Sequence, residues 1–307
     1  MKRIATMIGI LMLAAVGKAQ QELQVSQYMF NGLFLNPAYA GSHDYWGATA
    51  LHRSQWVSFP GAPRSNMLAV DGPVKGKNMG LGFQFINDAT GLLATNEVAA
   101  NYSYYIKLND KDHRLAFGVR AGIRNETFNA NGLENIPDAG DPLYQQGNQS
   151  FWIPRVNIGM YYYTTKAYVG LSSHNMLSVD ERRNLNSDAG LRRHYFLNAG
   201  YVMNVTSSGF VKFKPSVLVK YQAAAPIQAD LNAHFLFNDR FWLGVSWRTK
   251  AAFVMMAEFQ LTQQLRIGYA FDATTTGIRT YQNGSHEIMV GYDFTQKLVK
   301  IKHPRYF

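Results

Sequence analysis

The sequence predicts an all-β fold: a single transmembrane antiparallel β-barrel of about fourteen strands that follows a cleaved signal peptide. Three observations predict it. Many segments alternate between apolar and polar side chains, the connections between them alternate between short and long, and aromatic residues make up 14% of the chain. Because no apolar run after residue 19 is long enough for a membrane-spanning helix, the sequence does not favour a helical membrane protein.

The alternation is clearest in residues 115–124, which read Leu-Ala-Phe-Gly-Val-Arg-Ala-Gly-Ile-Arg. Successive side chains of a strand point to opposite faces, so Phe117, Val119 and Ile123 share an apolar face while Arg120 lies on the other. A soluble sandwich buries its apolar face against a second sheet, whereas a membrane barrel points it at lipid and keeps charges in the lumen. Since charged residues recur on the second face of strand after strand, the barrel is the better interpretation.

The first two segments of the chain precede the predicted strands. Residues 1–19 resemble an export signal, with Lys2 and Arg3 before a short apolar core and small residues before a cleavage site. Residues 20–44 show no alternation, and Pro37 interrupts any regular element there. We expect residues 20–44 to form an ordered periplasmic or plug segment that packs on or in the barrel.

The barrel itself is expected over residues 45–294. Its strand candidates are about 45–56, 66–72, 79–87, 96–107, 113–125, 152–163, 167–173, 194–205, 210–221, 226–237, 241–249, 252–261, 265–273 and 287–294. The longest connections, 126–151, 174–193 and 274–286, all fall at one end, and tight turns fall at the other. Short periplasmic turns with long outer loops are typical of outer-membrane barrels, and an even strand number places both termini in the periplasm.

Residues 295–307 follow the last predicted strand as a basic tail that ends in Pro304, Arg305, Tyr306 and Phe307. This periplasmic tail is expected to be either an unstructured end or a segment that docks on a partner.

The formal net charge of the whole chain, +10, would suit lipid headgroups, an acidic protein or nucleic acid as a partner, and export makes nucleic acid the least favoured of the three.

Several cationic side chains share the inward-facing parity of the predicted strands. They are Arg53, Arg120, Arg124, Arg155, Lys212, Lys214, Lys220 and Arg266. Two arrangements are open: a cationic lumen that attracts an acidic segment, or a plugged interior in which the cations pair with acidic residues. We favour the second, and the inward-facing partners would be Glu97, Asp230, Glu258, Asp272 and Asp293.

No motif in the chain predicts catalysis. The nearest approach to a hydrolase site is Ser172, Ser173, His174 and Asn175, but neighbouring strand residues point to opposite faces and no third orienting group is identifiable. The eight histidines lack metal-ligand spacing, and the chain contains no cysteine. We therefore expect a protein that is not an enzyme and that uses no metal and no cofactor, with a hydrolase at His174 as the enzymatic alternative.

Several motifs resemble the PorP/SprF family of type IX secretion outer-membrane proteins. They are Gln27-Tyr28 followed by Asn36-Pro37-Ala38-Tyr39-Ala40-Gly41, then Arg53-x-Gln55-Trp56 with Gly61-x-Pro63, then Asn87-Asp88-x-x-Gly91, and finally Pro304-Arg305-Tyr306-Phe307. The resemblance spans nearly the whole mature chain. It implies an integral outer-membrane barrel without catalytic residues that works in type IX secretion and, in some members, in gliding.

The resemblance also implies partners. Family members are associated with a periplasmic ring lipoprotein or ring protein and a peptidoglycan-binding protein, or with export and surface attachment of cargo such as gliding adhesins. On this basis Asn36, Pro37, Tyr39 and Gly41, together with residues 304–307, are the expected partner-binding or plug contacts. A general porin with an open lumen is the other reading of the same barrel.

Overall fold

The computed structural model describes residues 23–108, 113–129, 148–177, 192–223 and 225–294. The predicted signal peptide, the tail at 295–307 and most of the longest predicted connections lie outside these residues. Within them, the chain forms one antiparallel sheet that closes on itself, because β1 pairs with β15 and β10 pairs with β11. The predicted fold class, a β-barrel of fourteen antiparallel strands, is confirmed.

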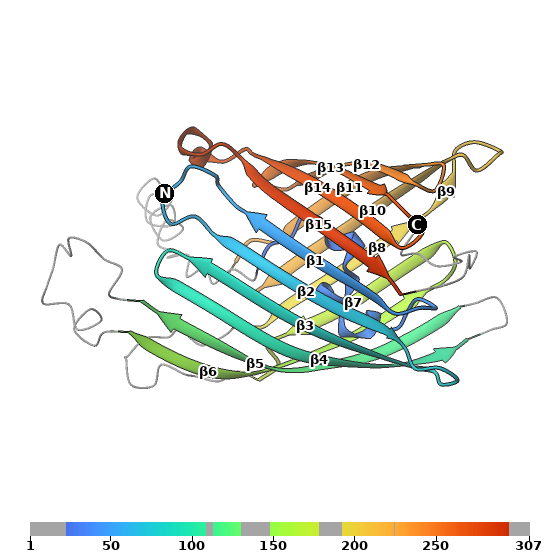
Figure 1. Ribbon diagram of the computed structural model, residues 1–307, viewed down its shortest axis with the longest axis horizontal. Coiled ribbons are helices and arrows are strands. Elements are labelled where there is room, and N and C mark those ends of the chain that lie inside the picture. The colour runs from blue at the N-terminus through green and yellow to red at the C-terminus, as the bar shows by residue number, and fades with distance from the viewer. Residues whose placement is uncertain (1–22, 109–112, 130–147, 178–191, 224, 295–307) are drawn as a thin grey trace, which may run out of the picture.

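The strands of the wall run obliquely across the molecule and follow one another in chain order around the barrel (Figure 1). Their bounds are β1 Gly47–Ser54, β2 Arg64–Pro73, β3 Met79–Thr90, β4 Leu93–Lys107, β5 Arg114–Phe128, β6 Gln149–Tyr163, β7 Ala167–His174, β8 His194–Tyr201, β9 Met203–Asn204, β10 Val211–Gln222, β11 Gln228–Phe237, β12 Phe241–Arg248, β13 Ala252–Gln260, β14 Leu265–Thr274 and β15 Ser285–Asp293.

β8 and β9 are two parts of one wall strand, predicted as 194–205. Both pair with β10 in a single register, in which Gly200 lies opposite Ser216 and Met203 lies opposite Phe213. This register places Pro215 opposite Tyr201, next to the interruption. Because proline has no N–H to donate, it removes a possible hydrogen bond from the ladder at this level. The wall therefore has fourteen strands although its regular structure divides into fifteen segments.

The two ends of the barrel differ. We call the end with the connections β5–β6, β7–β8 and β14–β15 the long-loop end, and the other the short-turn end. The first residue of β1, Gly47, pairs with the last residue of β15, Asp293, so the wall begins and finishes at the short-turn end. In the β14–β15 connection, the short helix η4 (Gly277–Tyr281) lies at the long-loop end.

The wall alternates as the sequence predicts. On β5, Phe117, Val119 and Ile123 expose 40–46% of their surface to the outside, whereas Arg120 exposes 2% and faces the lumen. Outward-facing apolar side chains recur around the barrel, as expected for a wall in contact with lipid. The inward face is not uniformly polar, however, because Leu51 and Met289 are also buried there.

Residues 23–44, which we call the plug, lie inside the ring of strands, where Figure 1 shows them in blue. They form three short helices, η1 (Tyr28–Phe30), α2 (Gly32–Leu35) and η2 (Pro37–Tyr39). Nearly every residue from 25 to 43 is buried, and two apolar clusters join the plug to the wall. The core of the protein is therefore the interface between the plug and the inner wall. None of the described helices is both long and apolar enough to cross a membrane.

Candidate functional site

The plug runs the length of the lumen. Leu23 borders a cavity together with Gln55, Lys250 and Thr276, all of which lie at the long-loop end. Gly41 lies at the other end, against Gly80 at the start of β3. The sequence predicts both termini at one end of the barrel, and this holds for the first and last wall strands. Leu23, however, lies at the opposite, long-loop end, because the chain crosses the lumen between Leu23 and the start of β1.

Asn36 fixes the middle of the plug. Its backbone is extended, and its side-chain oxygen accepts a hydrogen bond of 2.9 Å from the N–H of Ala38, which caps the short helix that begins at Pro37. The Asn36 amide nitrogen donates to the carbonyl of Met160 at 2.9 Å and to that of Leu171 at 3.3 Å. One side chain therefore shapes the plug and also attaches it to β6 and β7.

Glycines on the wall let the plug backbone approach the strands. A Cβ added to Gly118 of β5 would overlap backbone atoms of Ala38, and one added to Gly159 of β6 would overlap the side-chain oxygen of Asn36. The overlap at Gly118 is with backbone and cannot be relieved by turning a side chain, whereas the overlap at Gly159 is with the Asn36 side chain, which its own hydrogen bonds hold in place. The small inward-facing residues of the wall are therefore required by the plug.

Gly41 and Tyr39 complete the predicted N-terminal motif. Gly41 has φ of +63°, a conformation that favours glycine, and its N–H donates to a carboxylate oxygen of Asp71 at 3.1 Å. The ring of Tyr39 packs against that of Tyr161 with centroids 5.6 Å apart. Asn36, Pro37, Tyr39 and Gly41 are all buried and contact the inner wall. Partner binding by this motif stays a proposal.

Side chains of the wall also bind carbonyl groups of the plug. Arg120 donates to the carbonyl oxygens of Leu33 and Phe34. On β7, the hydroxyl of Ser172 and Nε2 of His174 both lie within hydrogen-bond distance of the carbonyl oxygen of Leu35, at 2.6 and 2.9 Å. A carbonyl can only accept, so Nε2 carries the proton. These contacts give Ser172 and His174 a structural role in holding the plug.

The start of the plug is held by a buried ion network. Arg53 contacts Asp272 at 2.8 Å and Glu287 at 3.1 Å, and Arg248 contacts the same Asp272 at 2.8 Å. Ser26 of the plug donates its hydroxyl to Asp272, and its backbone N–H donates to Glu287 at 2.8 Å. These charges lie almost wholly out of solvent and satisfy one another, which is the condition under which buried ions are tolerated.

The other cations predicted to face the lumen do so as well. Arg124 and Arg155 lie 3.3 and 3.4 Å from Glu97, Arg266 lies 3.3 Å from Asp293, and Lys220 lies 3.2 Å from Asp230. Lys214 is buried over the rings of Tyr168 and Trp242. Lys212 pairs with the exposed Asp239 at 2.5 Å. Among the described residues, the arrangement is therefore mainly one of paired charges around a plug, with Lys214 placed over aromatic rings.

Three members of the ion network were missed by sequence reasoning, namely Arg248, Glu287 and Ser26. Arg248 shares the inward parity of Ser246, and Glu287 shares that of Asp293, so the alternation alone would have placed both in the lumen. Ser26 carries no such signal, because its segment has no periodicity. The remaining predicted site residues, Pro304, Arg305, Tyr306 and Phe307, lie outside the described residues.

A protein-family model described as "Type IX secretion system membrane protein PorP/SprF" matches residues 17–292 of this chain. The match includes the plug and almost the whole barrel wall. It coincides with the family that the sequence motifs resemble.

Three solved structures are similar to this chain. The Acinetobacter baumannii outer membrane protein Omp33 is 6% identical, covering 83% of this chain and 100% of its own, with a TM-score of 0.48. A Pseudomonas aeruginosa FadL homologue is 11% identical, covering 92% and 97%, with a TM-score of 0.46. The KdgM porin is 11% identical, covering 81% and 99%, with a TM-score of 0.40. No curated protein matches the chain.

Proposed function

Because the chain belongs to the PorP/SprF family of type IX secretion system membrane proteins, we propose that it serves type IX secretion as a plugged, non-enzymatic outer-membrane barrel. In this role it acts through contacts made at its ends, not by passing solutes through its lumen. The short-turn end faces the periplasm, as in other outer-membrane barrels with long outer loops. The proposed partners there are the periplasmic ring components, a peptidoglycan-binding protein, or secreted cargo.

The filled lumen is the observation that supports this proposal. The plug is attached to the wall by the ion network at Arg53 and Asp272 and by hydrogen bonds to the carbonyls of Leu33 and Leu35. It also lies directly against the wall at Gly118. A general porin needs a continuous aqueous path, and a segment packed this tightly is poorly suited to provide one. The contacts therefore favour a docking or anchoring barrel over a porin.

Residues 295–307 are the proposed docking segment, because they follow Asp293 at the end we assign to the periplasm. Deletion of these residues should leave the barrel assembled and heat-modifiable in gels, because every wall strand precedes them. Secretion of type IX cargo into the medium should be lost. A second variant replaces only residues 304–307 with alanine and keeps Lys297, Lys300 and Lys302, which separates the terminal motif from most of the basic charge.

The outcome that contradicts the docking role is normal secretion by the truncated protein. Loss of secretion together with loss of the heat-modifiable form would instead indicate a folding defect. Co-purification from native membranes in mild detergent then identifies the partner, and the truncated protein should no longer retain it.

A further inference from the structure

Four asparagine side chains form a row on the outward-facing side of the wall, across β2 to β5. The strand registers place Asn66 opposite Asn87, Asn87 opposite Asn96, and Asn96 opposite Asn125. Glu97, the neighbour of Asn96, is buried in the lumen, so the alternation of the strand points Asn96 outward. We call these four asparagines the amide row. They lie two or three residues from the long-loop ends of their strands, about 7–10 Å along each strand.

Hydrogen bonds join the side chains of the amide row to one another. The side-chain nitrogen of Asn66 donates to the side-chain oxygen of Asn87 at 3.1 Å, and that of Asn87 donates to Asn96 at 2.8 Å. On β1, Nδ1 of His52 lies 2.8 Å from the side-chain oxygen of Asn66. A primary amide has two N–H donors and an oxygen that accepts two bonds. Each of these amides therefore keeps a donor that its neighbours in the described part of the chain do not use.

The next row toward the middle of the wall is apolar and follows the same registers. It consists of Leu68, Phe85, Val98 and Ile123, each of which exposes 36–45% of its surface. Each lies two residues further along its strand than an amide, a distance of about 7 Å. Polar surface thus changes to apolar surface at one level across four strands. This arrangement suits an amphiphile whose headgroup contacts the amides and whose acyl chains lie along the apolar side chains.

The row on the other side of the amides, nearer the rim, leaves room for a headgroup. It consists of Arg64, Ala89, Ala94 and Thr127, again in register. The two alanines are too small to cover the amides. Arg64 is exposed and forms no ion pair with any described residue, and a guanidinium group binds phosphate well.

The other side of the barrel differs at the same level. The outward-facing residues nearest the long-loop ends of β8, β10, β12 and β13 are aromatic, namely Tyr195, Tyr221, Trp247 and Phe253. Aromatic residues at this level are typical of a barrel in contact with the lipid interface. Amides in place of aromatic rings therefore make β2 to β5 a distinct surface of the wall.

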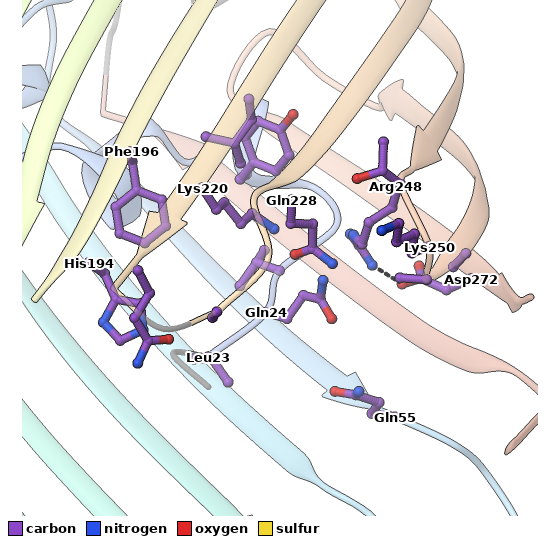
Figure 2. A pocket seen from close by; sticks show the side chains of 18 of the residues that line it. Leu23, Gln24, Gln55, His194, Phe196, Lys220, Gln228, Arg248, Lys250 and Asp272 are labelled. Atoms are coloured by element: carbon purple, nitrogen blue, oxygen red, sulfur yellow. Dashed lines mark hydrogen bonds and ion pairs between the residues drawn. The ribbon is translucent and has the colours of Figure 1, made fainter. Parts of the chain in front are cut away.

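The amide row is separate from the cavity at the long-loop end of the lumen. Leu23, Gln24 and Arg248 border that cavity, which lies between the plug and the wall (Figure 2). Arg53 borders it too, whereas His52, the preceding residue of β1, is exposed on the outside. Neighbouring residues of a strand point to opposite faces. A molecule bound at the amide row therefore approaches from the membrane and not through the lumen.

We propose that the amide row, together with His52 and Arg64, binds the headgroup of a glycolipid in the outer leaflet of the membrane. Sugar hydroxyls both donate and accept hydrogen bonds, as amides do, and Arg64 pairs with a phosphate on the sugar. The row covers three strand spacings, about 14 Å, which suits two linked sugars better than the headgroup of one glycerophospholipid. The inference rests on the proposed orientation, with the long-loop end outside, but not on the secretion role.

Lipid retention by the full-length protein tests the proposal. The protein is placed in phosphatidylcholine nanodiscs that contain equal amounts of lipid A, a phosphorylated and acylated sugar dimer, and phosphatidylglycerol, a phospholipid with one phosphate. Native mass spectrometry then counts the lipids that stay bound to the released barrel. Lipid A should be retained about tenfold more than phosphatidylglycerol, because it forms several additional hydrogen bonds. Equal retention of the two lipids would overturn the proposal.

A triple variant, Asn66→Leu with Asn87→Leu and Asn96→Leu, removes the amides and keeps an outward face that lipid tolerates. Its barrel should stay heat-modifiable, while its preference for lipid A should fall about tenfold. Retention of lipid A by this variant at the natural level would contradict the proposal. The matched variant should keep the preference, because it changes to leucine three aromatic residues on the other side of the barrel, namely Tyr195, Tyr221 and Trp247.

Arg64→Gln gives a second measurement that changes only one exposed side chain. It should lower the retention of lipid A about tenfold and leave that of dephosphorylated lipid A unchanged. An equal effect on both lipids, or on neither, would contradict the phosphate contact. A photo-reactive side chain at Ala94 that cross-links in cells to a protein and not to a glycolipid would assign this surface to a protein partner. The nanodisc measurements are independent of cargo secretion and of the orientation in the cell.

Discussion

Gly118 of β5 lies directly against Ala38 of the plug, with backbone facing backbone. A Cβ at position 118 would overlap the nitrogen and Cα of Ala38. Gly118 is flanked by Phe117 and Val119, which both face outward, so this one strand meets lipid on one side and the plug on the other. The absence of a side chain at a single position thus determines how deeply the plug can seat.

We predict that Gly118→Val displaces the plug. Insertion of a side chain into a packed interior costs about 1–3 kcal/mol when neighbours can adjust, and here the neighbour is backbone. The natural protein should carry no steady current in a planar bilayer, whereas the variant should show frequent openings. Gly277→Ala is the control, because nothing lies within 4 Å of a Cβ at that position. A steady current through the unaltered protein would contradict the closed lumen and favour a porin.

The ion network at the start of the plug gives a second prediction. Arg53→Gln removes a partner from Glu287 and from Asp272, and loss of one member of a buried pair costs about 3–5 kcal/mol. Combining it with Glu287→Gln should cost less than the sum of the single effects, by about 0.5–3 kcal/mol. Free energies of unfolding from urea titrations in lipid vesicles measure both.

The pair Lys212–Asp239 is the control for this cycle, since Asp239 exposes 67% of its side chain, although Lys212 exposes only 14%. Its coupling should be about 0–1 kcal/mol. Additive effects at Arg53 and Glu287 would mean that their contact does not stabilise the plug.

The outer surface of the barrel was predictable from the sequence because it depends only on local alternation. All fourteen predicted strands occur, and Pro215 explains the one interruption. The plug contacts were not predictable in the same way. Residues 23–44 have no period, and their burial depends on where inward glycines such as Gly118 and Gly159 happen to meet them.

The individual ion pairs in the lumen could not be predicted from the sequence either. Parity places Arg53 and Asp272 inside the lumen, but it does not say that they touch, because β1 and β14 are separated by β15. Their contact exists only once the barrel has closed. Sequence reasoning could therefore name the charged faces and favour pairing, but could not identify Arg248 as the second partner of Asp272.

Substitution of His174 distinguishes a structural role of this residue from a catalytic one. His174→Ala removes one of two hydrogen bonds to the carbonyl of Leu35 and leaves a gap beside Phe196, whose ring centroid is 4.7 Å away. We expect a loss of stability of about 1–3 kcal/mol. His174→Gln keeps a donor and should recover part of the loss. A lipase or protease activity in the purified protein that disappears in both variants would restore the hydrolase reading.

The outward face gives a prediction that depends on depth in the membrane. Val245 lies in the middle of β12, and its register partners Ala233 and Met255 lie near the middles of β11 and β13. The Val245 side chain faces outward, and the residue exposes 58% of its surface. Val245→Lys therefore places a charge in the hydrocarbon layer and should cost about 2–4 kcal/mol of folding free energy in vesicles.

Leu261, directly after β13 at the short-turn end, has a similar exposure of 49%, and Leu261→Lys should cost only about 0–1 kcal/mol because its ammonium reaches the headgroups. If the protein were instead a water-soluble β-sandwich, both substitutions would be tolerated, because a lysine exposed to water keeps its hydration. The difference between the two variants thus measures the medium around the barrel. Equal and small costs at positions 245 and 261 would mean that the exposed apolar face meets water, and the membrane assignment would fail with it.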